Sequence, residues 1–387
     1  AAGRIGTEEG GLDLLAHLWG MLPALPRTLI AFAVVLGPLV FVHELGHYLA
    51  ARWRGVHVDA FSIGFGRPLF RRTDRHGTEW RLGWLPLGGY VKLHGQETPE
   101  DTTPEQRAAW RPGRTFHEKP VGSRAIVVAA GPVANFLLAI LLFAGLFATV
   151  GQPVGTTGIG AVMEGSPAAH AGLQPGDEIL ALDGRRMTRF EQIQQYIQPR
   201  AGQTVEVRVA RNGSELVLSA VPEPRASAQG TVGVLGIQGG AARFERLDPA
   251  SALAAGVLQT ADVTWQTLTG VAQMIVGQRS AEELGGPIRI AEIAGQAASH
   301  GVVQLISLIA LLSVGLGLLN LFPIPLLDGG HLLFYAAEAI RGRPLPPKAQ
   351  EYGFRAGFVL LVTLFVFVSW NDIVHGGIGR WVARLIG

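Results

Sequence analysis

The chain of 387 residues is 48% hydrophobic and only 16% charged, and its mean hydropathy is +0.29. The apolar residues gather in long runs, which indicates a protein of the lipid bilayer. A formal net charge of +2 gives no support to binding of nucleic acid, and the absence of cysteine excludes disulfides, thiolate metal ligands and a cysteine nucleophile.

Four apolar stretches are long enough to cross a bilayer, which requires about 20 residues of helix. The sequence therefore predicts a polytopic α-helical membrane protein with four transmembrane helices, at residues 28–53, 123–150, 302–322 and 354–372. Residues 323–341 are expected to form a re-entrant segment, because their apolar part is too short to span. Residues 1–27 are an N-terminal segment and residues 373–387 a C-terminal tail.

Arginine and lysine gather in the loop after the first helix and in the short loop before the fourth. Basic loops of this kind mark the cytoplasmic side of a membrane. Both termini and the long stretch between the second and third helices are then expected on the extracytoplasmic side.

The first apolar stretch ends in a polar motif, His43-Glu44-Leu45-Gly46-His47. Residues four apart lie on one face of a helix, so His43 and His47 can bind one ion together. Neutral imidazoles suit Zn²⁺, and Glu44 lies where it can take a proton from zinc-bound water. The alternative is a surface helix that carries these residues by chance. Their place on a membrane helix argues against it, because a charged side chain there costs about 2.5–3.5 kcal/mol.

Beyond the second helix the composition is that of a soluble β-domain. Residues 205–209 alternate apolar with polar side chains, and Asn212-Gly213 predicts a tight hairpin turn before a returning strand. The run from 165 to 184 resembles the PDZ domains of bacterial proteases, which bind an extended peptide as an added strand. We assign this domain to residues 155–224, the alternative being a plain β-domain without a peptide ligand. Residues 245–300 are expected to form extracytoplasmic amphipathic helices.

A catalytic zinc usually has three protein ligands and one open position for water. The best candidate for the third ligand is Asp328, near the end of a run that extends from Asn320 to Gly330. The first and third helices need similar lengths to reach their polar clusters, which places both clusters ~22–27 Å into the membrane. Two prolines break the helix before Asp328, and broken backbone at that depth is tolerated only where it is buried or lines a wet cavity. His331 is a rival third ligand, and otherwise a buried or interfacial histidine.

Together these motifs resemble the site-2 protease family, and in particular its bacterial regulator-of-sigma-E branch. The resemblance covers residues 28–372 and includes further runs at 61–66, 87–92 and 131–135. It implies that zinc is held by three side chains and that a fourth acts as general base. The three zinc ligands would be His43, His47 and Asp328, and the general base would be Glu44.

The resemblance also implies roles for residues around the metal. Asn320 would bind the substrate backbone, and Asn135 would help to position the site, its alternative role being to join helices by hydrogen bonds. Residues 54–122 would form a membrane-associated β-hairpin region that dips into the bilayer from the cytoplasmic side. The edge of this region could pair with an unwound substrate near Gly64, Phe65 and Gly66. The alternative is that these glycines only form turns.

The activity, partners and location implied by the resemblance follow from the same family. The expected reaction is zinc-dependent cleavage of a single-span membrane protein in regulated intramembrane proteolysis, the substrate being an anti-sigma factor-like protein or a remnant signal peptide. The lipid bilayer and a peptide at the PDZ groove are expected partners, and no nucleic acid is expected. The expected location is the bacterial inner membrane, with the active site toward the cytoplasmic leaflet. The best-known enteric members carry two PDZ domains in tandem, whereas this sequence shows one. The resemblance therefore does not carry over a tandem-domain size filter that excludes intact substrates, and the choice between peptide binding and size filtering by the one domain stays open.

Two other functions stay open on the sequence alone. A membrane-anchored protease that cuts misfolded proteins in the cytosol would take its third zinc ligand from a soluble helical domain, and the sequence shows none. A non-enzymatic scaffold or transporter that gathers partners through its PDZ domain would have an incomplete site, and all four key residues are present.

Overall fold

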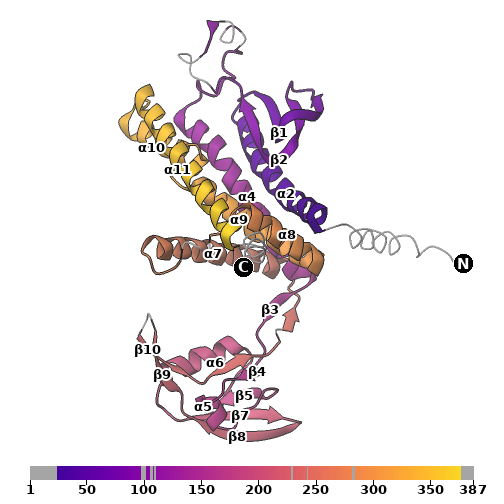
Figure 1. Ribbon diagram of the computed structural model, residues 1–387, viewed down its shortest axis with the longest axis vertical. Coiled ribbons are helices and arrows are strands. Elements are labelled where there is room, and N and C mark those ends of the chain that lie inside the picture. Colours follow the sequence, from indigo (N-terminus) through magenta and orange to yellow (C-terminus); the bar gives the residue numbers. More distant parts are fainter. Residues whose placement is uncertain are drawn as a thin grey trace, which may run out of the picture. The chain divides into compact units, whose positions relative to one another are not determined.

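The computed structural model describes residues 24–96, 102–104, 108, 110–227, 230–241, 243–280 and 284–375. Most of the expected N-terminal segment and C-terminal tail therefore lies outside the described residues. The chain divides into two units, one of residues 1–145 with 253–387 and one of residues 146–252, and each is described by itself (Figure 1).

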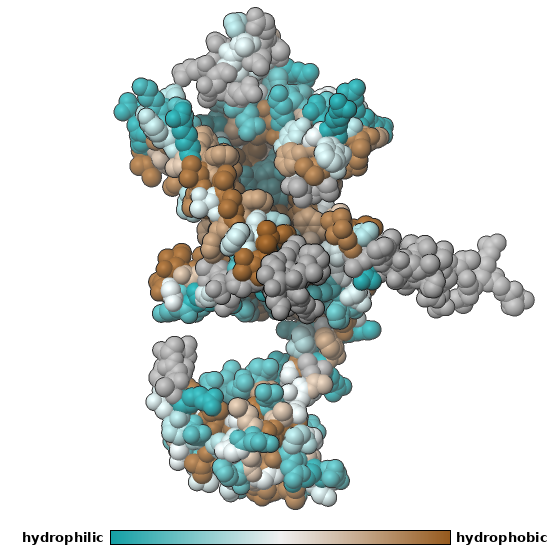
Figure 2. Space-filling view, viewed as in Figure 1, coloured by the Kyte–Doolittle hydropathy of each residue, from teal (hydrophilic) through white to brown (hydrophobic). Residues whose placement is uncertain are grey.

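Four helices of the first unit are long and apolar enough to cross a membrane, as the sequence predicted. They are α2 (Ala24–Trp53), α4 (Val121–Thr149), α9 (Val302–Leu321) and α11 (Pro347–His375). α11 begins earlier than predicted, because a polar helical turn that starts at Pro347 precedes its apolar run. Figure 2 shows hydrophobic surface over the helices of this unit. Large apolar side chains of α11, among them Phe358 and Trp370, are exposed. A surface of this kind suits contact with lipid.

Among its described residues, the first unit has three further helices, namely α7 (Pro249–Ile275), α8 (Pro287–His300) and α10 (Asp328–Arg341). The start of α8 is joined to the end of α11 by the buried carboxylate of Asp372. This carboxylate accepts hydrogen bonds from three backbone N–H groups, those of Gly286, Ile288 and Arg289. The first N–H groups of a helix have no partner within it, so Asp372 both caps α8 and anchors α11.

The break between α9 and α10 is held by glycines that pack directly on backbone. A Cβ atom on Gly329 would lie 2.3 Å from the carbonyl oxygen of Leu321, and one on Gly330 would lie 2.4 Å from that of Ile324. Leu326 takes a positive φ of 86° in the same turn. No larger residue fits at either glycine without a shift of the chain, and this tight return makes Asp328 the first residue of α10.

Between α2 and α4 the chain forms a long hairpin of two strands, β1 (Val58–Thr73) and β2 (Glu79–Leu93). Ala60 lies opposite both Lys92 and Glu79, so the first half of β1 pairs with both ends of β2. This half packs on α2 through a buried cluster that includes Phe61 and Tyr48. The second half of β1 is exposed from Phe65 onward.

The turn of this hairpin is organised by Asp74. Its carboxylate accepts hydrogen bonds from Trp80 Nε1 (3.0 Å) and from the backbone N–H groups of His76 and Thr78. Burial raises the pKa of the Asp74 carboxyl, but these hydrogen bonds outweigh it and lower the pKa to about 2.

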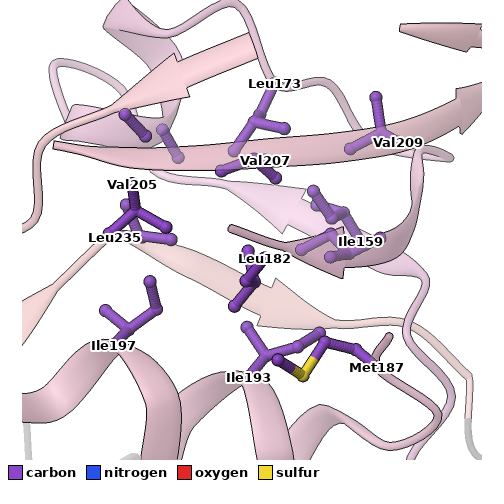
Figure 3. Close-up of a cluster of buried hydrophobic side chains, with 13 residues drawn as sticks. Ile159, Leu173, Leu182, Met187, Ile193, Ile197, Val205, Val207, Val209 and Leu235 are labelled. Atoms are coloured by element: carbon purple, nitrogen blue, oxygen red, sulfur yellow. The ribbon is translucent and has the colours of Figure 1, made fainter. Parts of the chain in front are cut away.

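The second unit is built on a four-stranded sheet with the order β6-β5-β7-β8. These strands are β5 (Glu178–Leu182), β6 (Arg185–Arg186), β7 (Val205–Arg211) and β8 (Ser214–Ala220). β7 and β8 are joined at Asn212 and Gly213, both with positive φ, as the hairpin pattern predicted. The inward residues of β7 meet the helix α6 (Phe190–Ile197) in the core, where Figure 3 shows Ile193 and Ile197 pointing toward Leu182, Val205 and Leu235.

The remaining elements of this unit are short. β9 pairs with β10, β11 with β4 and β12 with β3, so residues well beyond 224 belong to the same unit as the strands before it. Leu235 of this later part is buried in the common core. The bounds are β3 (Gln152–Val154), β4 (Ile159–Val162), α5 (Pro167–His170), the 3₁₀ turn η2 (Gln198–Arg200), β9 (Glu223–Ser227), β10 (Gly230–Val234), β11 (Ile237–Gly239) and β12 (Arg243–Glu245).

Candidate metal centre

Two helices of the first unit bring three possible metal ligands together. His43 and His47 lie one turn apart on α2, and their Nε2 atoms are 3.2 Å from each other. Oδ2 of Asp328, at the start of α10, lies 3.2 Å from Nε2 of His43 and 3.4 Å from Nε2 of His47. Within the described chain, these are the three side chains whose atoms converge closely enough to hold one ion. The rival ligand His331 lines the same cavity but is not part of this group.

The arrangement fits a zinc ion. Nδ1 of His47 donates to the carbonyl oxygen of Val127 (2.9 Å), so the lone pair of the neutral ring is on Nε2. Oδ2 of Asp328 is buried and has no hydrogen-bond donor among the described atoms. Acceptor atoms that face one another in this way repel unless a cation lies between them. Ligands about 2.0–2.2 Å from a tetrahedral zinc are about 3.3–3.6 Å apart, and the observed separations of 3.2, 3.2 and 3.4 Å are close to these values.

Glu44 lies between the two histidines in sequence, and its side chain is only 9% exposed. Its carboxylate faces the backbone N–H of Val91 on β2. β2 can pass this closely because residue 89 is glycine: a Cβ atom there would lie 2.9 Å from Cγ of Glu44 and 2.7 Å from the carbonyl oxygen of Ser62. The hairpin is therefore in direct contact with the predicted general base.

The helix α4 supplies no ligand but contacts both histidine rings. Besides the carbonyl of Val127, it presents the side-chain amide of Asn135 at 3.2 Å from Nδ1 of His43. Asn135 is fully buried. A histidine that binds metal through Nε2 carries its proton on Nδ1, and the amide oxygen of Asn135 is the atom that suits this proton. Gly131 allows the close approach, because a Cβ atom on it would lie 2.3 Å from Nε2 of His47.

A cavity of about 580 Å³ opens from these residues. Asn320 lines it, and its amide nitrogen donates to the carbonyl oxygen of Leu316 (3.0 Å) on the same helix. The described residues that line the cavity do not include Gly64, Phe65 or Gly66. They do include Tyr90, and the ring of Phe65 stacks on Tyr90 with the ring centroids 6.3 Å apart. Polar and charged lining residues beyond the ligands include Arg124, His331, Tyr335, Glu338 and Gln350. The site is thus polar and accessible although it lies on membrane helices, as hydrolysis requires.

The sequence motifs did not reveal all of the residues that shape the site. The Val127 carbonyl and the close packing at Gly46, Gly89 and Gly131 come from the structure. All three glycines lie inside motifs that the sequence had singled out, at 43–47, 87–92 and 131–135, but the motifs did not show what packs against them.

A second, smaller cavity of about 190 Å³ lies in the second unit, between α6 and the segment that joins β10 to β11. No charged side chain is among its lining residues. Gln194 and Gln198 supply its polar side chains, and the remaining lining residues are Phe190, Ile193, Ile197, Val232, Gly233, Val234, Leu235, Gly236 and Ile237.

Comparison with known proteins finds similarity along almost the whole chain. A protein of Rhizobium meliloti named as a zinc metalloprotease is 43% identical over 366 residues, which are 91% of this chain and 98% of that one. The metalloprotease MmpA of Caulobacter vibrioides is 38% identical over 92% of this chain and 98% of its own. The regulator of sigma-E protease RseP of Salmonella typhimurium is 32% identical over 93% of this chain and 99% of its own.

Among solved structures, a PDZ domain of an SdrC-like protein from Listeria monocytogenes matches with 22% identity and a TM-score of 0.20, over 23% of this chain and 90% of that one. The model of Peptidase family M50 matches residues 31–364. The resemblance inferred from the motifs is thereby confirmed, and the chain belongs to peptidase family M50.

Proposed function

We propose that this protein is an intramembrane zinc endopeptidase that cleaves the transmembrane segment of single-span proteins. The observation that carries the proposal is the convergence of His43 and His47 of the apolar helix α2 with Asp328 at the start of α10, with Glu44 beside them. Membership of a peptidase family and the names of the relatives support a metalloprotease with zinc as its cofactor.

The roles of the residues follow from their places. His43, His47 and Asp328 would hold the ion, which when bound supplies a Lewis acid and an acidified water. Glu44 takes a proton from the attacking water and returns it to the leaving amine, as its position beside the ligands allows. Asn320, in the cavity wall, binds the substrate backbone and holds the scissile carbonyl in place.

Substrate capture is assigned to the edge of β2 beside Glu44. A helix hides its peptide bonds, so a transmembrane substrate must become extended before it is cut. Gly89, Tyr90 and Val91 line the cavity, and in the described part of the chain their sheet contains no strand other than β1 and β2. An extended substrate can pair with this edge, while Phe65, with Gly64 and Gly66 on either side, supports it through the stack on Tyr90.

The lipid bilayer and a peptide ligand are the other proposed partners, and each is supported by one of the two units. The four apolar helices support a location in the lipid bilayer, and the relatives support a bacterial inner membrane. The basic loops favour a cytoplasmic hairpin and an extracytoplasmic second unit. The uncharged cavity beside α6 supports binding of an apolar peptide segment by this PDZ-like unit.

The test is cleavage of a tagged model transmembrane segment by the purified protein in lipid nanodiscs, with the zinc content of each variant assayed in parallel. Wild type should contain zinc and cut. Glu44→Gln should keep zinc and lose activity, whereas Asp328→Asn should lose both. Absence of zinc from wild type, or cleavage by Glu44→Gln at the wild-type rate, would refute the proposal.

A further inference from the structure

The helix α4 acts as a common frame for the metal centre, although it carries none of the ligands. Its Val127 carbonyl accepts from the ring of His47, and its Asn135 amide contacts the ring of His43. Both histidines of α2 are thus oriented from the same neighbouring helix. The third ligand, Asp328, lies on a different helix, so its position depends on how α10 is held.

A partly buried ion pair joins α10 to the start of α4. Nη2 of Arg124 lies 2.6 Å from Oε1 of Glu338, and the two side chains are only 16% and 12% exposed. Nε of Arg124 donates to the carbonyl oxygen of Lys119 (3.1 Å), and its guanidinium carbon lies 4.9 Å from the centre of the Tyr335 ring. The guanidinium of Arg124 therefore has three neighbours that hold it in place, and it in turn holds the carboxylate of Glu338.

Glu338 and Asp328 lie on one helix, about 15 Å apart along its axis at ~1.5 Å per residue. A straight helix is stiff over this length, so a contact at Glu338 limits the tilt and rotation of α10 at Asp328. The N-terminal end of α10 is held in turn by the glycine contacts at Gly329 and Gly330. Arg124 and Glu338 also line the same cavity as the ligands, but they contact one another and are not part of the group that could hold the metal.

We propose that the Arg124–Glu338 ion pair positions Asp328 for metal binding by tying α10 to α4, the helix that already orients both histidines. Arg124 and Glu338 are thus positioning residues and not catalytic ones. The inference rests on the proposed zinc site. Loss of either partner leaves the other charge partly buried and without its counter-charge, which favours a movement of α10 that separates the two groups.

The experiment measures the rate at which zinc passes from the detergent-purified full chain to a chromophoric chelator, and the absorption spectrum of the Co²⁺-substituted protein. Glu338→Gln and Arg124→Gln should release zinc about 10–100-fold faster than wild type and alter the Co²⁺ spectrum. The exchanged pair Arg124→Glu with Glu338→Arg should restore much of both properties. Arg355→Gln is the matched control, because Arg355 forms an exposed ion pair with Glu351 on α11.

Zinc release and Co²⁺ spectra that are unchanged in both single variants would overturn the inference. If either variant fails to fold, Glu338→Asp keeps the charge while shortening the side chain, and it should still accelerate release. An unchanged rate in Glu338→Asp, together with no recovery in the exchanged pair, would equally overturn it. A wild type without zinc would instead refute the proposed function, so the two failures are distinguishable.

Discussion

Gly131 of α4 lies directly against the imidazole of His47, so close that a Cβ atom on it would fall 2.3 Å from Nε2. The ring has no room to move away without giving up its hydrogen bond to the Val127 carbonyl, which comes from the same helix. The position of the His47 ring in the metal centre therefore depends on how closely α2 packs on α4.

Gly131→Ala should displace the ring of His47 and abolish most zinc binding, with a loss of activity of at least about 100-fold. Metal content by atomic absorption and cleavage of the model substrate measure the two effects. Gly122→Ala is the control on the same helix, since a Cβ atom at Gly122 meets nothing within 4 Å. Equal zinc content in both variants would contradict the role assigned to Gly131.

Gly89→Ala should separate catalysis from metal binding. The added methyl group would press on Glu44, which is not a ligand, and would push β2 away from the base. We expect kcat to fall by about 10–100-fold while the zinc content stays at the wild-type level. The control is Gly37→Ala on α2, where the added group has open space. A parallel loss of zinc in Gly89→Ala would show that the hairpin supports the ligands rather than the base.

Asn135→Ala should weaken zinc binding by about 10–100-fold, because Nδ1–H of His43 is left without an acceptor. Asn135→Asp keeps an acceptor oxygen and should retain more affinity than Asn135→Ala. Competition with a chelator of known affinity measures the difference. Ser313→Ala serves as control, since the Ser313 hydroxyl donates to the backbone carbonyl of Asn135 (2.8 Å) and not to its amide. The same affinity in Asn135→Ala and wild type would assign Asn135 to helix packing alone.

The second unit should lose stability in acid through Asp177. Its buried carboxylate binds Arg211 through two hydrogen bonds of 2.6 and 2.7 Å, and this guanidinium foremost lowers the pKa of Asp177 below its ordinary value. The stabilisation is therefore complete above the unfolded-state pKa of about 3.9 and is lost as pH falls through the lower folded-state pKa.

The measurement is urea unfolding of residues 146–252, which have a hydrophobic core of their own. Asp177→Asn should lower the free energy of unfolding at pH 7 by about 1–3 kcal/mol and flatten its decline below pH 4. Arg208→Gln is the control, because Arg208 is largely exposed and its nearest carboxylate is 3.9 Å away. An equally steep acid dependence in Asp177→Asn and wild type would exclude Asp177 as its source.

Much of the metal centre could be predicted from the sequence because helix periodicity places His43 and His47 on one face, and Glu44 directly follows His43 in the chain. Asp328 required a further argument, since only the comparable depth of two apolar helices connects it to the histidines. The carbonyl of Val127 could not be predicted, because every residue has such a group and its partner is decided by tertiary packing. The same holds for Gly89. Only the packing of β2 against α2 shows that a side chain at this position would have no room.

In the second unit, the sequence predicted the central hairpin but not the strands that follow it. The alternation in residues 205–209 and the Asn212-Gly213 turn identified β7 and β8 directly. The strands after 224 are short and rich in glycine, so they carry no periodic pattern, and Leu235 joins the core through long-range pairing.

The distribution of the ligands along the chain has a consequence for biosynthesis. His43 and His47 are made early, whereas Asp328 follows only after the whole second unit and α9 have been translated. A nascent or truncated chain that ends before α10 has two histidines and a base but no third ligand. The proposed metal site is therefore incomplete while the chain is being inserted, and on this proposal cleavage requires that α10 has first packed beside α2.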